Sequence, residues 1–345
     1  MRLNVILIMA VLLVSAIPAA VAKDHRPLFD DETVLDLTLS GPIGEISRKP
    51  DAAPVPGVLK VEGASPETLP IALTTRGMTR RMPQICAFPP LRIIFSEKPA
   101  KTSLFRGQKA LKLVTHCQGP ERFEQGVLLE YDAYRLYRLM TDQSFGARLA
   151  KVNYTDNAGH PVTTRMGFFL EDINDVAKRA DRKRFRGANR ISETQLDPTA
   201  AARFAVFEYM ISNLDWAMTA GQPGQDCCHN SRLLAVPGTA TGLVGVPYDF
   251  DYSGLVDASY AVPPDGINVS SVRVRRYRGF CAHNEQAKAV MTDVLARRAA
   301  FMAVIDQTPG LSNYYRDKAD GYMGEFFEQI ASPQDVDRMM EYCLR

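Results

Sequence analysis

The first residues constrain the chain most, because they determine the compartment in which it folds. Arg2 precedes an unbroken apolar run of ten residues, Val5 to Val14, which is too short to cross a bilayer as a stable helix. Ala20-Val21-Ala22 then provides a small-x-small cleavage site. Residues 1–22 are therefore predicted to be a secretory signal peptide that is cleaved after Ala22. An uncleaved membrane anchor is the alternative.

No later stretch approaches the roughly 18 consecutive apolar residues of a membrane-spanning helix. We therefore expect no integral membrane segment after cleavage. The mature protein should be periplasmic or extracellular, where it could associate with the cell envelope. Such compartments are oxidising and favour disulfide bonds over free thiols.

Six cysteines follow the predicted cleavage site, namely Cys86, Cys117, Cys227, Cys228, Cys281 and Cys343. An even number in an exported chain indicates disulfides, and we expect Cys86 to pair with Cys117. Adjacent cysteines rarely bond each other, so the neighbouring pair is expected to reach separate partners, one of them Cys281. Cys227-Cys228-His229 could instead bind a metal, but no second ligand pair follows at zinc-like spacing.

The charge balance limits the choice of partners. The net charge is only +2 at pH 7, which argues against nucleic acid as an obligatory partner. The basic segment Lys178–Arg190, KRADRKRFRGANR, is a local exception. A solvated loop or helix face is its simplest interpretation, and an anionic substrate or partner is the alternative.

The order of the expected elements suggests an α+β fold with a β-rich first half. Residues 23–68 read as a Pro/Gly-rich N-terminal extension with short strands, such as the alternating segment Val34–Leu39. Further strands are expected at 69–77, 89–95 and 109–116. A helix at 122–141 precedes a hairpin at 151–172, whose turn is Asn157-Ala158-Gly159.

The second half reads as mainly helical. A helix at 198–212 begins with Asp-Pro and carries apolar side chains at helical spacing. A short hairpin follows at 233–251, and helices are expected near 284–306, 312–331 and 333–343. We therefore expect two lobes, a β-rich lobe at 69–172 with one helix and a mainly helical lobe at 173–345.

The side chains most suited to chemistry lie between the 198–212 helix and the hairpin, namely Asn213, Asp215, His229, Asn230, Asp249 and Asp251. Carboxylates at helix and strand ends can converge, and such a cluster needs a cation or a shared proton. Magnesium is the natural cation, since it takes oxygen ligands from carboxylates and substrate phosphates. There are structural alternatives for each of these residues. Asp215 and Asn213 could cap a helix end, Asp249 and Asp251 could form a polar turn, and His229 could be structural.

The order of these residues resembles a known family. Asn-x-Asp, then His-Asn, then Pro-Tyr-Asp-Phe-Asp is similar to the catalytic segment of the CotH-type spore-coat kinases, which have an atypical protein-kinase-like fold. Upstream, LLEYDAYRLYRLM and GFFLED are similar to that family's helix and hinge strand, and TTRG is similar to an Arg-Gly turn. The resemblance covers roughly residues 70–260.

The resemblance implies a two-lobed atypical kinase-like fold. It also implies phosphoryl transfer from ATP, dependent on Mg²⁺, to a protein or small-molecule hydroxyl acceptor. Asp215 would be the catalytic residue, with Asn213 beside it. The magnesium ligands would be Asn230, Asp249 and Asp251.

The resemblance also implies residues that bind the nucleotide. Lys112 on a strand and Glu130 on the following helix would form an ion pair that positions phosphate. Arg76 and Gly77 would lie on the loop over the nucleotide, and the segment from Phe168 to Glu171 would contact the adenine. A surface lysine and an ordinary helix-face glutamate are the alternative for the ion pair.

Two other classes of function fit the same residues. A non-catalytic envelope protein could keep the scaffold as a binding or structural module. A hydrolase could use Asp215 with Asp249 or Asp251 as a pair of carboxylates at a defined separation. The chain has no G-x-S-x-G segment, which argues against a serine hydrolase.

Overall fold

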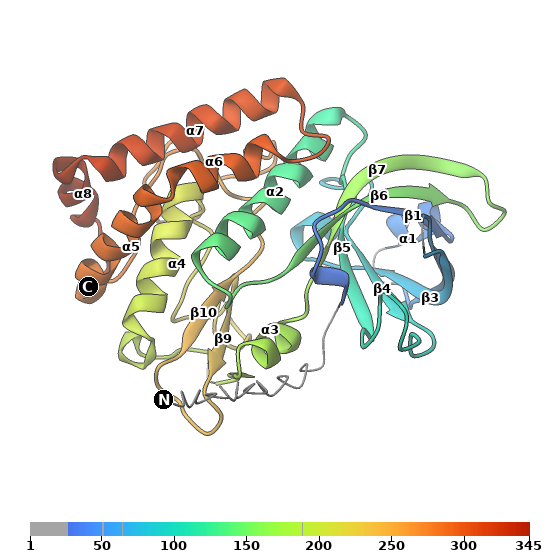
Figure 1. Ribbon diagram of the computed structural model, residues 1–345, viewed down its shortest axis with the longest axis horizontal. Helices are drawn as coiled ribbons and strands as arrows, with labels where there is room; N and C mark the ends of the chain where they lie inside the picture. The colour runs from blue at the N-terminus through green and yellow to red at the C-terminus, as the bar shows by residue number, and fades with distance from the viewer. Residues whose placement is uncertain (1–26, 50–51, 64, 188) are drawn as a thin grey trace, which may run out of the picture.

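The computed structural model describes residues 27–49, 52–63, 65–187 and 189–345. The predicted signal peptide and its cleavage site lie outside these residues. The strands of the first half of the chain form one body, and most helices pack together in the second half (Figure 1).

The elements of the first half are β1 (Leu35–Ser40), α1 (Ile43–Arg48), β2 (Val55–Val61), β3 (Glu67–Thr75), β4 (Leu91–Phe95), β5 (Ala110–Val114), α2 (Glu121–Met140), β6 (Ala147–Thr155) and β7 (Pro161–Leu170). Those of the second half are α3 (Ile173–Arg179), β8 (Lys183–Arg184), α4 (Pro198–Ile211), β9 (Ser231–Ala235), β10 (Val244–Pro247), α5 (Asn284–Ala296), α6 (Arg298–Asp306), α7 (Asn313–Ala331) and α8 (Pro333–Met340). Short 3₁₀ turns lie at Pro27–Phe29, Thr79–Arg81, Glu193–Gln195 and Cys281–His283.

Seven strands close into a barrel in the order β1-β2-β3-β4-β5-β7-β6. Neighbouring strands are antiparallel except where β1 meets β6, and this parallel pairing places Leu35 opposite Ala150 and closes the barrel. Burial alternates along β1, so that Leu35, Leu37 and Leu39 point into the barrel. This period of two is what a strand with one buried face requires.

The predicted two-lobed, kinase-like fold with a mainly helical second lobe is wrong. The strands close into a barrel because β1 and β2, from the segment read as an N-terminal extension, complete the sheet. The second half also contains a three-stranded sheet in the order β10-β9-β8. The described residues form eight α-helices, two of which, α1 and α2, belong to the first half of the chain.

Two apolar cores meet at the wall of the barrel. On β7, Phe169 fills the barrel, whereas its neighbour Phe168 faces outward into the core of the helical half. Tyr131 and Tyr134 of α2 pack on Phe168 with ring centroids 5.8 and 5.6 Å apart. Because side chains alternate along β7, Phe168 anchors α2 to the outside of the barrel, and the remaining faces of α2 pack against other helices.

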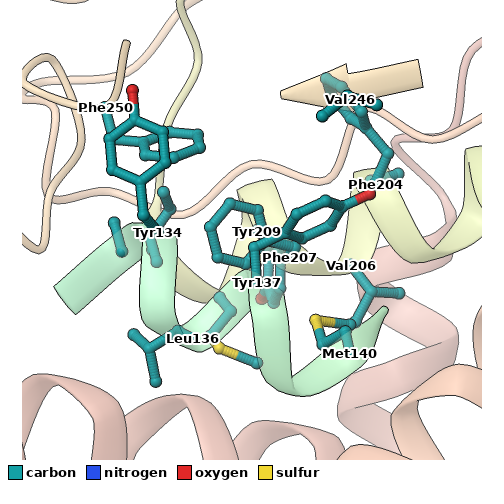
Figure 2. Packing of buried hydrophobic residues seen from close by; sticks show 14 of the residues in the cluster. Tyr134, Leu136, Tyr137, Met140, Phe204, Val206, Phe207, Tyr209, Val246 and Phe250 are labelled. Atoms are coloured by element: carbon teal, nitrogen blue, oxygen red, sulfur yellow. The ribbon is translucent and has the colours of Figure 1, made fainter. Parts of the chain in front are cut away.

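Helix α4 forms the centre of the second core. The carboxylate of Asp197 caps the helix by accepting a hydrogen bond from the Ala200 amide, and Pro198 occupies the first turn. From Ala200 to Ile211 every residue except Arg203 is buried. Figure 2 shows Phe207 of this helix close to Tyr137 and Phe250, with ring centroids 4.7 and 5.3 Å away.

Three disulfides cross-link the described residues. Cys86–Cys117 is confirmed, and it ties the loop before β4 to the end of β5. The other expected pairing is wrong, because the adjacent Cys227 and Cys228 bond each other. Cys281 pairs with Cys343, since the C-terminal residues lie beside Cys281. The adjacent thiols are thus not free to act as metal ligands.

The disulfides are consistent with an exported protein. In the part of the chain that the structure describes, every helix is too short or too polar to cross a membrane.

Most expected helices and hairpins are confirmed. The helix expected at 284–306 is divided into α5 and α6, because Arg297 leaves the helical conformation with φ −106° and ψ 18°. The antiparallel strands β6 and β7 form the hairpin expected at 151–172.

We expect Phe207→Ala to lower the free energy of unfolding by about 3–5 kcal/mol, because it leaves a cavity in contact with α2 and Phe250. Chemical denaturation followed by circular dichroism measures this loss. Val262→Ala, at a position 63% exposed, is the matched control and should stay within about 0.5 kcal/mol of wild type. Equal losses would contradict the central role of this contact.

Candidate active site

A cavity of about 370 Å³ lies between the barrel and the helical half. Its walls come from the loop after β3, the chain after α4, the segment leading into β9 and the turn after β10. We call it the polar cavity. It brings together six predicted site residues that are far apart in the sequence, namely Arg76, Gly77, Asp215, Asn230, Asp249 and Asp251.

Asp215 is held by hydrogen bonds on both of its carboxylate oxygens. His229 Nε2 lies 2.7 Å from Oδ1, and the Asn230 amide donates to Oδ2 at 3.0 Å and to the Asp215 carbonyl at 2.7 Å. Asn230 has φ +47°, a conformation that asparagine tolerates better than most residues. The start of β9 therefore fixes the direction of the Asp215 carboxylate.

Asn213 supports Asp215 from behind and does not line the polar cavity. It is 1% exposed, and its side-chain oxygen accepts a hydrogen bond from the Asp215 amide at 3.1 Å. The indole of Trp216 donates to the Asn213 carbonyl at 2.9 Å. In this arrangement Asn213 positions the loop and has no direct access to a ligand in the cavity.

Phe250 anchors the turn that carries the other two acids. Its ring is fully buried and lies 4.6 Å from the ring of Tyr134, whose hydroxyl accepts a hydrogen bond from the Asp249 amide. The side chain of Asp249 is 39% exposed to the polar cavity, whereas that of Asp251 is 7% exposed. Asp249 has φ +69°, so the turn selects a residue that tolerates the left-handed region.

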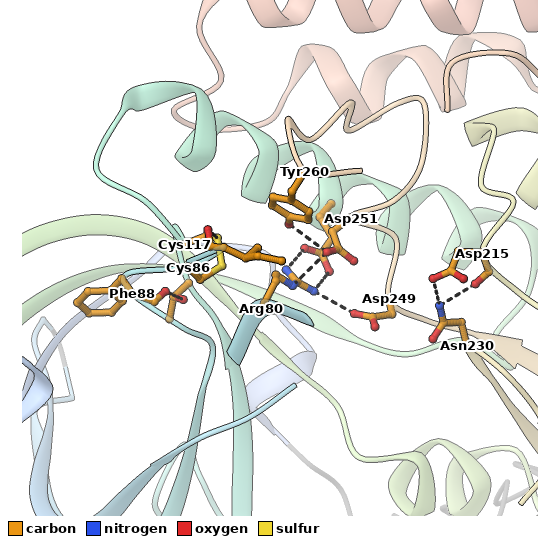
Figure 3. Close-up of polar contacts among 12 residues, drawn as sticks. Arg80, Cys86, Phe88, Cys117, Asp215, Asn230, Asp249, Asp251 and Tyr260 are labelled. Carbon is orange, nitrogen blue, oxygen red and sulfur yellow. Dashed lines mark hydrogen bonds and ion pairs between the residues drawn. A yellow bond between two sulfur atoms is a disulfide. The ribbon is translucent and has the colours of Figure 1, made fainter. Parts of the chain in front are cut away.

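The guanidinium of Arg80 joins three carboxylates at the edge of the polar cavity. Figure 3 shows it beside Asp249 and Asp251. Arg80 donates to Glu130 at 2.7 and 3.1 Å and to Asp249 at 2.9 Å, and its Nε lies 3.2 Å from Asp251. The Tyr260 hydroxyl donates to Asp251 at 3.0 Å. Arg80 is 6% exposed, so these ion pairs lie largely out of water.

The charges in this cluster do not balance. One oxygen from each of Glu130, Asp249 and Asp251 lies within 4.8 Å of the others, and Arg80 is the single cation in direct contact with all three. Burial raises the pKa of Glu130, and it raises the pKa of Asp251 to about 7. Since buried carboxylates resist ionisation, the cluster has an affinity for protons or for a further cation.

The expected Lys112–Glu130 ion pair is not formed, because Arg80 occupies Glu130. Lys112 lies on β5 with its amine 5.9 Å from the centre of the Phe145 ring. Burial lowers the pKa of Lys112 to about 8, and the positive charge of Arg76 adds to this effect. Lys112 is thus a buried amine whose charge an anion would stabilise.

The segment expected to contact adenine has another set of contacts here. Phe168 and Phe169 are fully buried in the two cores. Glu171 is 3% exposed, and its carboxylate accepts hydrogen bonds from the Gly146 amide at 2.7 Å and from Arg179 at 2.8 Å. Glu171 therefore ties α3 to the start of β6, and it does not line the polar cavity.

Sequence reasoning did not identify Arg80 or Arg232 as residues of this site, and it left the role of His229 open. Arg80 was overlooked because a loop rich in arginine gives no sign of which guanidinium is buried. For His229 the sequence leaves a structural role open as the alternative, whereas the structure shows that it contacts Asp215 and lines the polar cavity. The only sequence signal for this role was its position next to Asn230 at the start of a strand.

No protein-family model matches this chain, and a comparison with curated proteins finds no match either.

We expect Arg80→Met to lower the free energy of unfolding by about 3–5 kcal/mol at pH 8, since it leaves buried carboxylates without their cation. The loss should be smaller at pH 5.5. Burial raises the pKa of Asp251 from 3.8 to about 7, so the folded state holds a proton that the unfolded chain releases between these values. Stability therefore falls as the pH rises, and without Arg80 this fall continues to higher pH.

Denaturant unfolding at the two pH values measures this difference. Arg338→Met is the control, because Arg338 pairs with Asp335 at the surface with its side chain 70% exposed. It should cost less than about 1 kcal/mol at both pH values. An equal loss for Arg80→Met at pH 5.5 and pH 8 would mean that Arg80 contributes packing and not charge.

Proposed function

We propose that the protein transfers a phosphoryl group from ATP, with Mg²⁺, to a hydroxyl group of a protein or small molecule. One observation carries this proposal: oxygen ligands and cations line the same polar cavity. The oxygen ligands are on Asp215, Asn230 and Asp249, and the cations are Arg76, Arg80 and Arg232. The volume of about 370 Å³ lies within the range of small-molecule sites.

The donor set suits magnesium. Asp249 and Asn230 offer oxygen atoms at the cavity surface, and Mg²⁺ commonly binds one or two carboxylates together with substrate phosphates. The three carboxylates around Arg80 leave a negative charge that this one guanidinium does not cancel. Magnesium would supply the charge that neutralises phosphate oxygens during transfer.

The cations of the cavity would orient the phosphates. Arg76 and Arg232 line the cavity, and the positive charges of both lower the pKa of Lys112 in addition to its burial. Such like charges repel one another in the absence of an anion. The negative charge of a bound phosphate would offset this repulsion, so phosphate binding should raise the pKa of Lys112.

Asp215 would accept the proton of the attacking hydroxyl. Its two oxygens are oriented by His229 and Asn230, so its carboxylate presents a fixed direction to the cavity. His229 Nε2, 2.7 Å from Asp215, can share that proton after the transfer. Side chains held in these positions would support the alignment on which phosphoryl transfer depends.

We expect Asp249→Asn to abolish the thermal stabilisation of the mature chain by ATP with Mg²⁺. The amide keeps the shape and tolerates the positive φ of this position, but it removes the charge that would bind the metal. Asp257→Asn is the control, because Asp257 pairs with Lys318 outside the polar cavity. The proposal is wrong if millimolar nucleotide with Mg²⁺ fails to stabilise the wild-type protein.

Asp215→Asn should separate binding from transfer. We expect it to keep the stabilisation by ATP and Mg²⁺ and to lower the rate of phosphoryl transfer by about 10²–10⁴-fold, the usual contribution of a general base. Transfer of labelled phosphate, including to the protein itself, measures the rate. Binding of nucleotide with no transfer in the wild type would favour the non-catalytic alternative.

A further inference from the structure

Two arginines on one face of the small sheet, and a third just beyond its edge strand, lead into the polar cavity. In the pairing of β8 with β9, Arg184 lies opposite Leu234, so it shares a face with Arg232, two residues from Leu234. Arg232 lines the polar cavity. Arg186 lies two residues after Arg184, just beyond the end of β8, where the Phe185 amide still donates to the Leu233 carbonyl of β9 at 2.8 Å. We call these three residues the arginine track.

The positive charges of the arginine track have few counter-ions. Arg232 donates to the Ser231 carbonyl at 2.9 Å and lies 4.4 Å from the centre of the Tyr248 ring. Within the described residues, none of the three guanidiniums forms an ion pair with a carboxylate. Arg80, in contrast, contacts three carboxylates at the same cavity.

The arginines of the track are close enough to repel one another. Burial lowers the pKa of Arg184, and the charges of Arg232 and Arg186 lower it further, against a weaker opposing effect of Asp172 and Asp226. Repulsion between unpaired cations that are partly removed from water is unfavourable. A ligand with several negative charges would relieve it.

The position of β8 at the edge of the small sheet favours an extended ligand. Strand β8 lies at the end of the sheet order β10-β9-β8, and an extended segment can lie along such an edge strand. Side chains on one face of an extended chain recur about every 6.6–7 Å, at alternate positions. Acidic side chains at alternate positions would therefore meet successive guanidiniums, which bind carboxylates through paired hydrogen bonds.

We propose that the arginine track binds an extended segment of a partner protein that carries Asp or Glu at alternate positions. Because the track leads into the polar cavity, the same segment would present the acceptor hydroxyl. This second step rests on the proposed phosphoryl transfer, whereas the docking itself does not. The acceptor class would then be an acidic polypeptide.

A labelled peptide with alternating Glu and Ser tests the docking by fluorescence anisotropy with the mature chain. The control peptide has the same composition with its Glu residues consecutive. We expect tighter binding of the alternating peptide. Arg184→Gln and Arg186→Gln should each weaken that binding about tenfold, the usual effect of losing a hydrogen bond to a charged group.

Lys183→Gln is the matched control, because Lys183 is adjacent to Arg184 but points to the opposite face of β8. It removes the same charge and should leave binding within about twofold of wild type, as expected for an exposed cation that makes no contact. Equal weakening by Lys183→Gln and Arg184→Gln, or equal binding of both peptides, would contradict specific binding by the arginine track. Either result would mean that the peptide is attracted only by the overall positive charge. Thermal unfolding of each variant verifies that it folds.

The outcomes also separate this inference from the proposed function. Tighter binding of duplex DNA or of anionic lipid vesicles than of the alternating peptide would overturn the choice of partner. Loss of peptide binding in Arg184→Gln with intact stabilisation by ATP and Mg²⁺ supports the docking role. Peptide binding by a wild-type protein that does not respond to nucleotide would overturn the phosphoryl transfer and keep the docking surface.

Discussion

The contact of Arg80 with Glu130, Asp249 and Asp251 connects three separate parts of the fold. Arg80 lies on the loop after β3, Glu130 on α2, and the two aspartates on the turn after β10. The buried charges of Arg80, Glu130 and Asp251 would each be unfavourable alone, so their positions depend on one another. The same guanidinium borders both the polar cavity and an adjoining cavity of about 180 Å³. The shape of the candidate site thus follows from an electrostatic requirement.

The apolar core fixes the acids in place from the other side. Phe250 lies between Asp249 and Asp251 in the chain and is fully buried against Tyr134 and Phe207. Because its ring points into the core, the carboxylates on either side point toward Arg80. The packing of Phe250 against α2 and α4 therefore fixes the positions of Asp249 and Asp251 in the site.

The sequence was informative where the signal is local. The helix at 198–212 has a cap, a proline in its first turn and apolar spacing, and the convergence of Asp215, Asn230 and Asp249 follows from helix and strand ends. Barrel closure was not predictable, because the pairing of β1 with β6 has no local pattern. The choice of Arg80 as the partner of Glu130, in place of Lys112, depends on burial, which the identity of a loop residue does not reveal.

The closure of the barrel also affects the order of events during synthesis. Ser40 at the end of β1 and Thr155 at the end of β6 are 115 residues apart, and their hydroxyls lie 2.7 Å from each other. Since β1 emerges first, it has no partner on its β6 side until most of the first half of the chain has followed. Until then the backbone edge of β1 is unpaired and can join other chains, and such distant pairing also slows folding. Pairing of β6 with β1 is thus the step that removes this open edge.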